Sequence, residues 1–234
     1  MTLATDETRH ARDVLRLHPG DEIYVFDGEG CEYQCVIAEI TRASTRVDVI
    51  AEVEPAGNAS HLHLTLALAL TKGEKFDLAV QKATELGVSR VIPVVSERAD
   101  VRLRDAVDAG RRVARWQRIA LEAAKQCGRA RLMEITEPVA FDSLIASPAE
   151  DGERRLMFTE RGGTSTEVFS VSSQSGPSKV LAVIGPEGGW TDEEIELAGE
   201  GGWKIVTLGG RTLRAETAAI VIATLLQHRF GDLA

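Results

Sequence analysis

The sequence predicts an α/β protein in two parts: a small N-terminal β domain over residues 1–56, and a larger domain over residues 61–234 with a mainly parallel sheet. Short β-branched runs crowd the first part, and a stretch rich in Pro, Gly, Asn and Ser follows at 54–60 as a linker. Strands and helices then alternate to the end of the chain. This alternation is typical of a parallel sheet with helices on both faces.

The N-terminal part contains three runs with the length and composition of strands. Polar and glycine-containing breaks separate them, and this spacing indicates hairpins in a small barrel or sheet. A short helix is expected before them, over the segment RHARDVLRL at 9–17. The three expected strands are DEIYVFD at 21–27, YQCVIAEI at 33–40 and TRVDVIAEV at 45–53.

In the larger part, apolar side chains three and four residues apart predict helices, and short apolar runs predict strands. The first helix has Phe76 and Ala79 on one face and ends at Gly87. A later helix starts with Thr191 and Glu194, which have the spacing of a capping box. Strands are expected at 61–70, 90–95, 154–159, 179–185 and 203–209. Helices are expected at 72–87, 111–128, 191–202 and 215–230, and a surface loop at 170–178.

The composition is that of a soluble globular protein, with 44% hydrophobic and 27% charged residues. No apolar run reaches the roughly 18 residues that a membrane-spanning helix requires. The N-terminal segment is polar and charged, unlike a signal peptide. A cytoplasmic protein without a membrane partner is therefore expected.

The cysteine and histidine residues give no convincing metal site. The three cysteines, Cys31, Cys35 and Cys127, do not form a disulfide framework, because their number is odd. Cys31 and Cys35 lack a second Cys or His pair to complete four ligands. His61 and His63 share one face of an expected strand without a nearby third ligand. We expect ordinary strand side chains and no metal.

The charge is unevenly distributed along the chain. The net charge is −9, which argues against a protein that grips nucleic acid over its whole surface. Residues 98–131, however, hold ten Lys and Arg against four Asp and Glu, whereas residues 1–56 hold five against twelve. The basic segment fits a phosphate-rich partner that touches one face. The alternative is a solvated helix face.

The segment VIGPEGGWTDEEIE at 183–196 is the first candidate site. A strand-like run ends at Ile184, and Gly185, Pro186, Glu187 and two more glycines follow before a helix begins. Ligands of parallel sheets bind beyond the carboxyl ends of the strands, where a glycine turn lets the backbone approach them closely. The spacing matches neither a dinucleotide-binding loop nor a P-loop. A purely structural turn is the alternative.

The segment LGGRTLRAET at 208–217 is the second candidate site. Arg211 and Arg214 lie where the last helix begins, together with Glu216 and Thr217. Two arginines beside a helix N-terminus form a patch that favours anions. The alternative is a surface ion pair between Arg214 and Glu216.

Together these two segments resemble the RsmE family of 16S ribosomal RNA uracil-N3 methyltransferases, in the SPOUT superfamily. The segments KGEKFDLAVQKATELGVSRVIPVVSERAD at 72–100 and RWQRIALEAAKQCGR at 115–129 support this resemblance. It covers the chain from about residue 9 to its end. The motifs agree in order and spacing. In this chain Thr212 replaces an aliphatic residue of the family. Family members usually carry a short stretch with arginine and aromatic residues before the segment at 9–17, so we expect either that RNA contacts of that stretch are absent here or that the start site differs.

The resemblance implies a PUA-like β-barrel at the N-terminus and a SPOUT domain whose last strands and helix form a deep trefoil knot. The knot loops would bind S-adenosylmethionine, and a homodimer would complete the site. The implied reaction is methylation of N3 of a uridine in 16S rRNA, uridine 1498 in the usual rRNA numbering. The alternatives are a SPOUT methyltransferase with another RNA target, a non-catalytic RNA-binding factor, and a nucleotide-binding enzyme with another cofactor.

The resemblance, together with the chemistry of uracil N3, suggests roles for residues of this chain. Glu187 would orient or accept the N3 proton, unless it only accepts bonds from its own loop, and Arg214 would stabilise negative charge on the uracil or hold a phosphate. The cofactor-binding residues would be Thr159, Glu160, Ile184, Gly185, Gly189, Leu208, Gly209, Gly210, Leu213 and Thr217. The RNA-binding residues would be Arg9, Arg12, Arg16, Lys72, Arg98 and Arg211.

Overall fold

The computed structural model describes residues 1–57, 60–165 and 176–233. The chain divides into two compact units, Met1–Ala59 with Cys127–Leu132, and Ser60–Gln126 with Met133–Ala234. Residues 58–59 of the expected linker at 54–60 and residues 170–175 of the expected loop at 170–178 lie outside the described residues. The segment 127–132 joins the first unit, although the sequence pattern places it in the second part. The boundaries at 56 and 61 stay a prediction.

The N-terminal unit contains a three-stranded antiparallel sheet in the order β1-β2-β3, and its closure into a barrel stays a prediction. The strands are β1 (Glu22–Phe26), β2 (Glu32–Ile40) and β3 (Thr45–Val53), close to the expected ranges. Their buried core is small and contains Cys35, Ile37 and Val47.

The helix of this unit differs from the expected one at 9–17. It begins earlier, as α1 (Thr5–Arg9), and continues as a π-helical turn, η1 (His10–Val14). The acidic residues Asp6 and Glu7 lie in its first turn, where they stabilise the positive end of the helix. Arg16 has a φ of 54°, and this left-handed conformation stops the helix before the expected end.

The second unit contains an eight-stranded sheet in which each described pair of neighbours is parallel, in agreement with the prediction. The order is β6-β5-β4-β10-β8-β11-β9, and β7 pairs with β5. Its longer strands lie within two residues of the expected ones. They are β4 (His63–Ala69), β5 (Arg90–Val95), β8 (Glu153–Phe158), β10 (Lys179–Ile184) and β11 (Lys204–Thr207). The two-residue strands are β6 (Glu134–Ile135), β7 (Val139–Ala140) and β9 (Thr164–Ser165).

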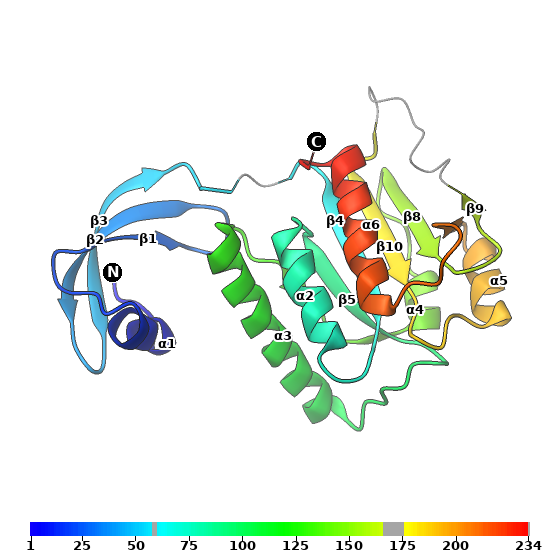
Figure 1. Ribbon diagram of the computed structural model, residues 1–234, viewed down its shortest axis with the longest axis horizontal. Helices are drawn as coiled ribbons and strands as arrows, with labels where there is room; N and C mark the ends of the chain where they lie inside the picture. The colour runs from blue at the N-terminus through cyan, green and yellow to red at the C-terminus, as the bar shows by residue number, and fades with distance from the viewer. Residues whose placement is uncertain (58–59, 166–175, 234) are drawn as a thin grey trace. The chain divides into compact units, whose positions relative to one another are not determined.

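Helices cover both faces of this sheet (Figure 1). Leu64, Leu66 and Leu68 of β4 pack with α2, α3 and α6, whereas Ala67 and Ala69 of the same strand pack with α4 and α5. The alternation of side chains along a strand thus produces two separate apolar clusters. The helices are α2 (Lys75–Glu85), α3 (Ala106–Cys127), α4 (Phe141–Ile145), α5 (Asp192–Glu200) and α6 (Ala215–Phe230).

Helix α3 begins five residues before the expected start at 111. The carboxylate of Asp105 accepts a hydrogen bond from the backbone N–H of Asp108 at 2.8 Å, which is the contact of an N-cap residue. The apolar period that predicted the helix starts only at Val113, so it missed the polar first turn. Among the described residues, no helix is both long and apolar enough to cross a membrane.

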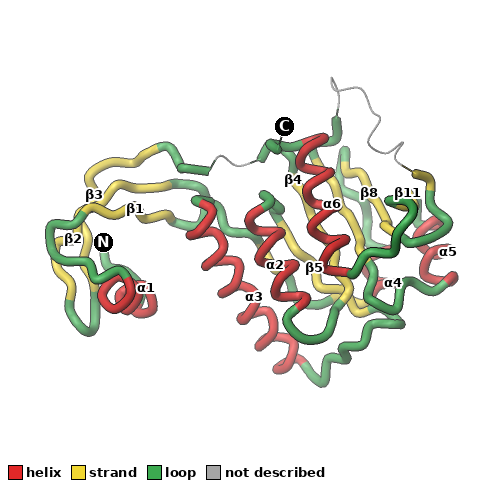
Figure 2. The backbone as a smooth tube through the Cα atoms, in the orientation of Figure 1, coloured by secondary structure: helices red, strands yellow, loops and turns green. Residues whose placement is uncertain are grey.

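The chain reverses its direction across the sheet after β11. Strand β11 lies next to β8, but α6 packs against α2 and β4, on the other side of β10. The connecting loop after Thr207 must therefore pass the ends of β8 and β10, as the tube in Figure 2 shows. This return brings the start of α6 to the carboxyl ends of the central strands.

Thr191 is the N-cap of α5, and the predicted capping box is confirmed. Its hydroxyl accepts from the Glu194 N–H at 3.1 Å, and the Glu194 carboxylate accepts from the Thr191 N–H at 2.9 Å. We expect Thr191→Ala to lower the free energy of unfolding by about 1–2 kcal/mol. Urea unfolding checks this value, with Thr191→Ser, which keeps the oxygen, as the control. Equal stability of the two variants would contradict it.

Candidate functional site

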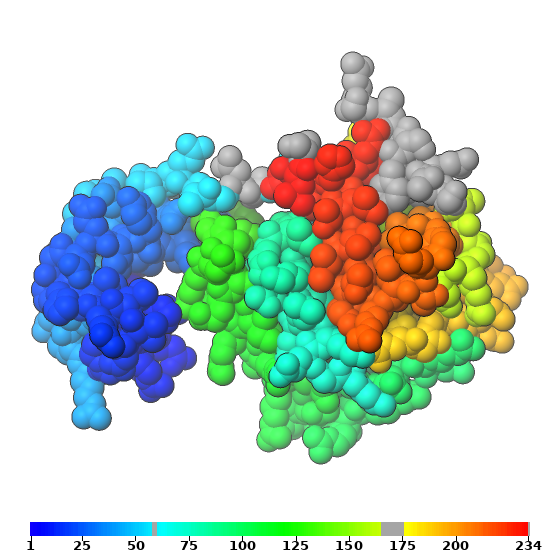
Figure 3. Space-filling model, in the orientation of Figure 1, coloured from blue at the N-terminus to red at the C-terminus, as the bar shows by residue number. Residues whose placement is uncertain are grey.

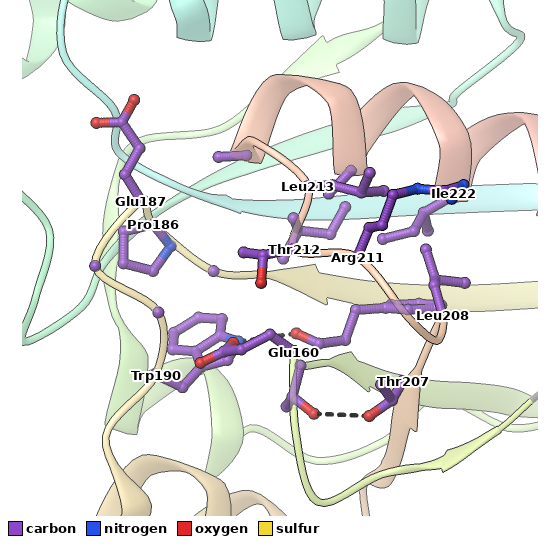
Figure 4. Close-up of a pocket in the computed structure, with 18 of the residues that line it drawn as sticks. Glu160, Pro186, Glu187, Trp190, Thr207, Leu208, Arg211, Thr212, Leu213 and Ile222 are labelled. Atoms are coloured by element: carbon purple, nitrogen blue, oxygen red, sulfur yellow. Dashed lines mark hydrogen bonds between the residues drawn. The ribbon is translucent and has the colours of Figure 1, made fainter.

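The carboxyl ends of β8, β10 and β11 surround a pocket that the start of α6 closes (Figure 4). Three loops contribute to it, as expected for a ligand site of a parallel sheet. Its lining consists of Phe158, Thr159, Glu160, Ile184, Gly185, Pro186, Glu187, Gly188, Gly189, Trp190, Thr207, Leu208, Gly209, Arg211, Thr212, Leu213, Ala215, Ala218 and Ile222.

The sharp turn after β10 follows from two glycines and a buried tryptophan. The N–H of Gly189 donates to the carbonyl of Pro186 at 3.0 Å, and Gly189 has a φ of +68° that L side chains rarely adopt. A Cβ on Gly185 would lie 2.9 Å from Nε1 of Trp190. The Trp190 ring is fully buried, and its Nε1 donates to the carbonyl of Phe158 at 3.0 Å. The turn is thereby attached to the neighbouring strand β8.

Two arginines hold the same turn from outside. Nη1 of Arg98 and Nη2 of Arg161 each donate to the carbonyl of Trp190 at 3.2 Å. Arg161 also forms an ion pair with Asp192 at 2.9 Å. Arg98, which the sequence analysis assigns to RNA, is thus engaged with the backbone of the turn, and its RNA contact stays a prediction.

Glu187 of the turn has a partner that the sequence analysis missed. Its carboxylate forms an ion pair with Lys75, the first residue of α2, and it accepts no side-chain bond from its own loop in the described structure. No sequence signal connects two residues so far apart. Figure 4 shows the Glu187 carboxylate pointing away from Trp190 and Glu160.

The end of β8 forms the opposite wall of the pocket. The N–H of Thr159 donates to the carbonyl of Val206 at 2.9 Å, and the Thr159 hydroxyl lies 3.4 Å from the Thr207 hydroxyl. Thr207 also lines the pocket, although it was not predicted from the sequence. A Cβ on Gly189 would lie 2.7 Å from Oε1 of Glu160. The Glu160 carboxylate has no ion-pair partner among the described residues, so it remains available to a ligand.

The loop after β11 supplies the remaining wall. Leu208, Gly209 and Leu213 line the pocket as the resemblance implies, and Figure 3 shows this loop at the surface beside α6. Gly210 and Thr217 do not line it. Thr217 lies on another face of α6 than Ala215, Ala218 and Ile222, whose spacing of three and four turns them toward the pocket. The cofactor contacts of Gly210 and Thr217 stay a prediction.

Arg214 is exposed and does not line this pocket either. The competing ion pair with Glu216 is not formed, and the guanidinium of Arg214 has no partner within residues 1–57, 60–165 and 176–233. Arg211 does line the pocket. In the part of the chain that the structure describes, neither arginine at the start of α6 forms an ion pair, so both can hold an anion.

The other predicted RNA-binding side chains lie at the surface. Arg9 and Arg16 are exposed, and Lys72 forms an exposed ion pair with Asp100 at 3.2 Å. Arg12 pairs with Asp13 at 2.6 Å, and this hydrogen bond lowers the pKa of the Asp13 carboxyl. The described residues contain no group of three His, Cys, Asp or Glu side chains that could hold a metal ion.

Two family models match the chain. A model described as an RNA methyltransferase domain matches residues 58–227, and one described as an RNA methyltransferase PUA domain matches residues 3–49. Together they cover both units of the structure.

Curated and solved relatives agree with these matches. The chain is 32% identical to ribosomal RNA small subunit methyltransferase E of Synechocystis sp., over 94% of this chain and 70% of the relative. The Bacillus subtilis protein of the same name is 30% identical, over 97% of this chain and 90% of the relative. The crystal structure of the Neisseria gonorrhoeae protein of this name, bound to S-adenosyl methionine, is 31% identical and covers 100% of this chain and 93% of that one, with a TM-score of 0.88. The motif resemblance is confirmed, and the chain belongs to the ribosomal RNA small subunit methyltransferase E (RsmE) family.

Proposed function

We propose that this protein transfers the methyl group of S-adenosylmethionine to N3 of a uridine in 16S rRNA, uridine 1498 in the usual numbering. The observation that carries the proposal is the pocket built by three strand ends, in a chain of the RsmE family. The substrate is part of the small ribosomal subunit, so we propose that the protein acts in the cytoplasm.

The residues of the pocket fit this cofactor. Ile184, Leu208 and Leu213 offer an apolar surface for an adenine ring. The glycines of the Gly185–Gly189 turn let its backbone lie close to Trp190 and Glu160, where a Cβ would clash. The Glu160 carboxylate complements a positively charged ligand. S-adenosylmethionine supplies a methyl group on a cationic sulfur, which needs no metal for its transfer.

The chemistry requires removal of the proton on uracil N3. We assign this proton to the carboxylate of Glu187, which holds it while the N3 lone pair forms the new bond to the methyl carbon and the carbon–sulfur bond breaks. Arg214 stabilises the negative charge that develops on the uracil oxygens. The proton then leaves Glu187 to solvent, so that the carboxylate is ready for the next turnover.

The proposal also includes the trefoil knot and the homodimer. The return of the chain from β11 to α6 supports a trefoil knot, formed where the 208–214 loop threads past the ends of β8 and β10. Ile220, Val221 and Leu225 of α6 are only partly buried, and this apolar face supports a homodimer through the helix, because apolar faces left open to solvent mark interfaces.

RNA binding would use basic side chains of both units. The N-terminal PUA-like unit would contribute Arg9, Arg12 and Arg16. The exposed Arg111, Arg115 and Arg118 of α3 lie at helical spacing in the basic segment 98–131 and would contact phosphates.

The experiment is methyl transfer from labelled S-adenosylmethionine to small ribosomal subunits that lack the modification, followed by nucleoside mass spectrometry. We expect labelled 3-methyluridine. Label in a ribose or in another base would contradict the N3 assignment and keep the cofactor. Cofactor binding without any label would favour a non-catalytic RNA-binding factor.

A further inference from the structure

A carboxylate next to the proposed site lacks a partner. Oε2 of Glu216, in the first turn of α6, is buried and has no hydrogen-bond partner within the described residues. An unpaired buried carboxylate oxygen is costly, so its presence next to the proposed site calls for an explanation.

The space in front of Glu216 has room for a donor. A small cavity of about 10 Å³ lies between α2, α6 and the end of β10, and Thr71, Lys75, Phe76, Gly185 and Glu216 are among the residues that line it. A cavity of this size holds roughly one water-sized group, and the ammonium group of a lysine has that size. Lys75 is the cationic side chain among the described lining residues.

Lys75 is engaged elsewhere, with Glu187 of the turn after β10. Its side chain is 37% exposed and long, so its ammonium group is free to change direction. The two helices that begin at Lys75 and just before Glu216 pack against each other. Lys75 thus pairs with the carboxylate of Glu187 and lines the same small cavity as the unpaired carboxylate of Glu216.

We propose that Lys75 is a positioning residue that moves from Glu187 to Glu216 when the substrate base binds, and thereby frees the Glu187 carboxylate to accept the N3 proton. The inference rests on the proposed function for the identity of the base. While Lys75 is bound to Glu187, its ammonium group occupies the carboxylate oxygen of Glu187 that must accept the N3 proton. After the move, Lys75 fills the cavity beside Glu216 and pairs with its carboxylate, so the exchange replaces one ion pair by another. The carboxylate of Glu187 is then the unpaired one until it accepts the N3 proton.

The first test asks whether Lys75 has two partners, and it needs neither cofactor nor RNA. Lys75→Met is introduced into three backgrounds. We expect it to lower the melting temperature of the wild-type protein and also that of the Glu187→Gln variant, because Glu216 then remains as a partner. In the double variant Glu187→Gln with Glu216→Gln it should have little effect. Lys82→Met is the matched control, because Lys82 pairs with Glu85 on the same helix. Its effect should be equal in all three backgrounds. If Lys75→Met no longer lowers the melting temperature of the Glu187→Gln single variant, the proposal is overturned.

The second test uses a size difference at Lys75. Arginine at this position keeps the charge and the pairing with Glu187, but its guanidinium is too large for the cavity beside Glu216. We expect Lys75→Arg to keep the melting temperature and both KM values, for S-adenosylmethionine and for small ribosomal subunits, and to lower kcat about tenfold. Glu216→Gln should lower kcat in the same way. A purely structural pair between Lys75 and Glu187 would leave kcat of Lys75→Arg unchanged, and that result would overturn the proposal.

The two tests separate this inference from the proposed function. If the wild-type protein methylates no uridine but the melting temperatures follow the expected pattern, the proposed function fails and the two partners of Lys75 stand. If the wild-type protein forms 3-methyluridine and Lys75→Arg retains its kcat, the proposed function stands and the movement of Lys75 is overturned.

Discussion

Replacing Glu187 with glutamine is expected to lower kcat for methyl transfer by about 100-fold or more, because glutamine keeps the size of the side chain but cannot hold the N3 proton. Binding of S-adenosylmethionine should change little, since the Glu187 carboxylate points away from the wall formed by Glu160 and Trp190. Single-turnover transfer to unmodified small subunits measures the chemical step, and calorimetry measures the cofactor affinity.

The control for this variant is Glu196→Gln, which removes an exposed carboxylate from α5, outside the pocket lining. It should transfer methyl groups at the wild-type rate. The ion pair between Lys75 and Glu187 is partly exposed, so its loss should change the stability by no more than about 1 kcal/mol. Glu187→Gln with a wild-type kcat would exclude Glu187 as the base.

Replacing Gly189 with alanine is expected to weaken binding of S-adenosylmethionine about tenfold or more, which corresponds to about 1.4 kcal/mol. The new Cβ would lie 2.7 Å from Oε1 of Glu160, so the carboxylate must leave the wall of the pocket. The φ of +68° adds a backbone cost of about 1–2 kcal/mol for any L side chain. Isothermal titration calorimetry measures the affinity, and thermal unfolding measures the stability.

Gly202→Ala is the matched control for this second variant. Gly202 has a φ of +77°, and a Cβ there would have no neighbour within 4 Å. Both variants should therefore lose similar stability through the backbone, and only Gly189→Ala should also lose cofactor affinity. Equal affinities of the two variants would show that the Glu160 wall does not contribute to cofactor binding.

The sequence predicted the elements whose signal is local. The parallel sheet followed from the alternation of apolar runs and helical periods, and α6 (Ala215–Phe230) was predicted with its observed bounds. Thr191 and Glu194 determined the start of α5 through their own hydrogen bonds. The short elements α4 and β6 were missed, because one helical turn or two extended residues leave no measurable period.

Some residues of the candidate site also have a local sequence signal, and others do not. The glycines and Glu187 could be found in the sequence because a turn beyond a strand needs particular residues at consecutive positions. Lys75, Arg98 and Arg161 could not be assigned to this turn. Each reaches it from another element, with a partner that no spacing rule connects to it.

The sequence by itself thus determined the type of each long element, the two candidate segments and the family resemblance. Only the tertiary structure decided which side chains meet. It attached Trp190 to β8, gave Glu187 the partner Lys75, and left Oε2 of Glu216 without a partner among the described residues. The physical reason is that helix and turn formation depends on neighbours along the chain, whereas the partners of a charge depend on the return of α6 across the sheet, which joins segments far apart in sequence.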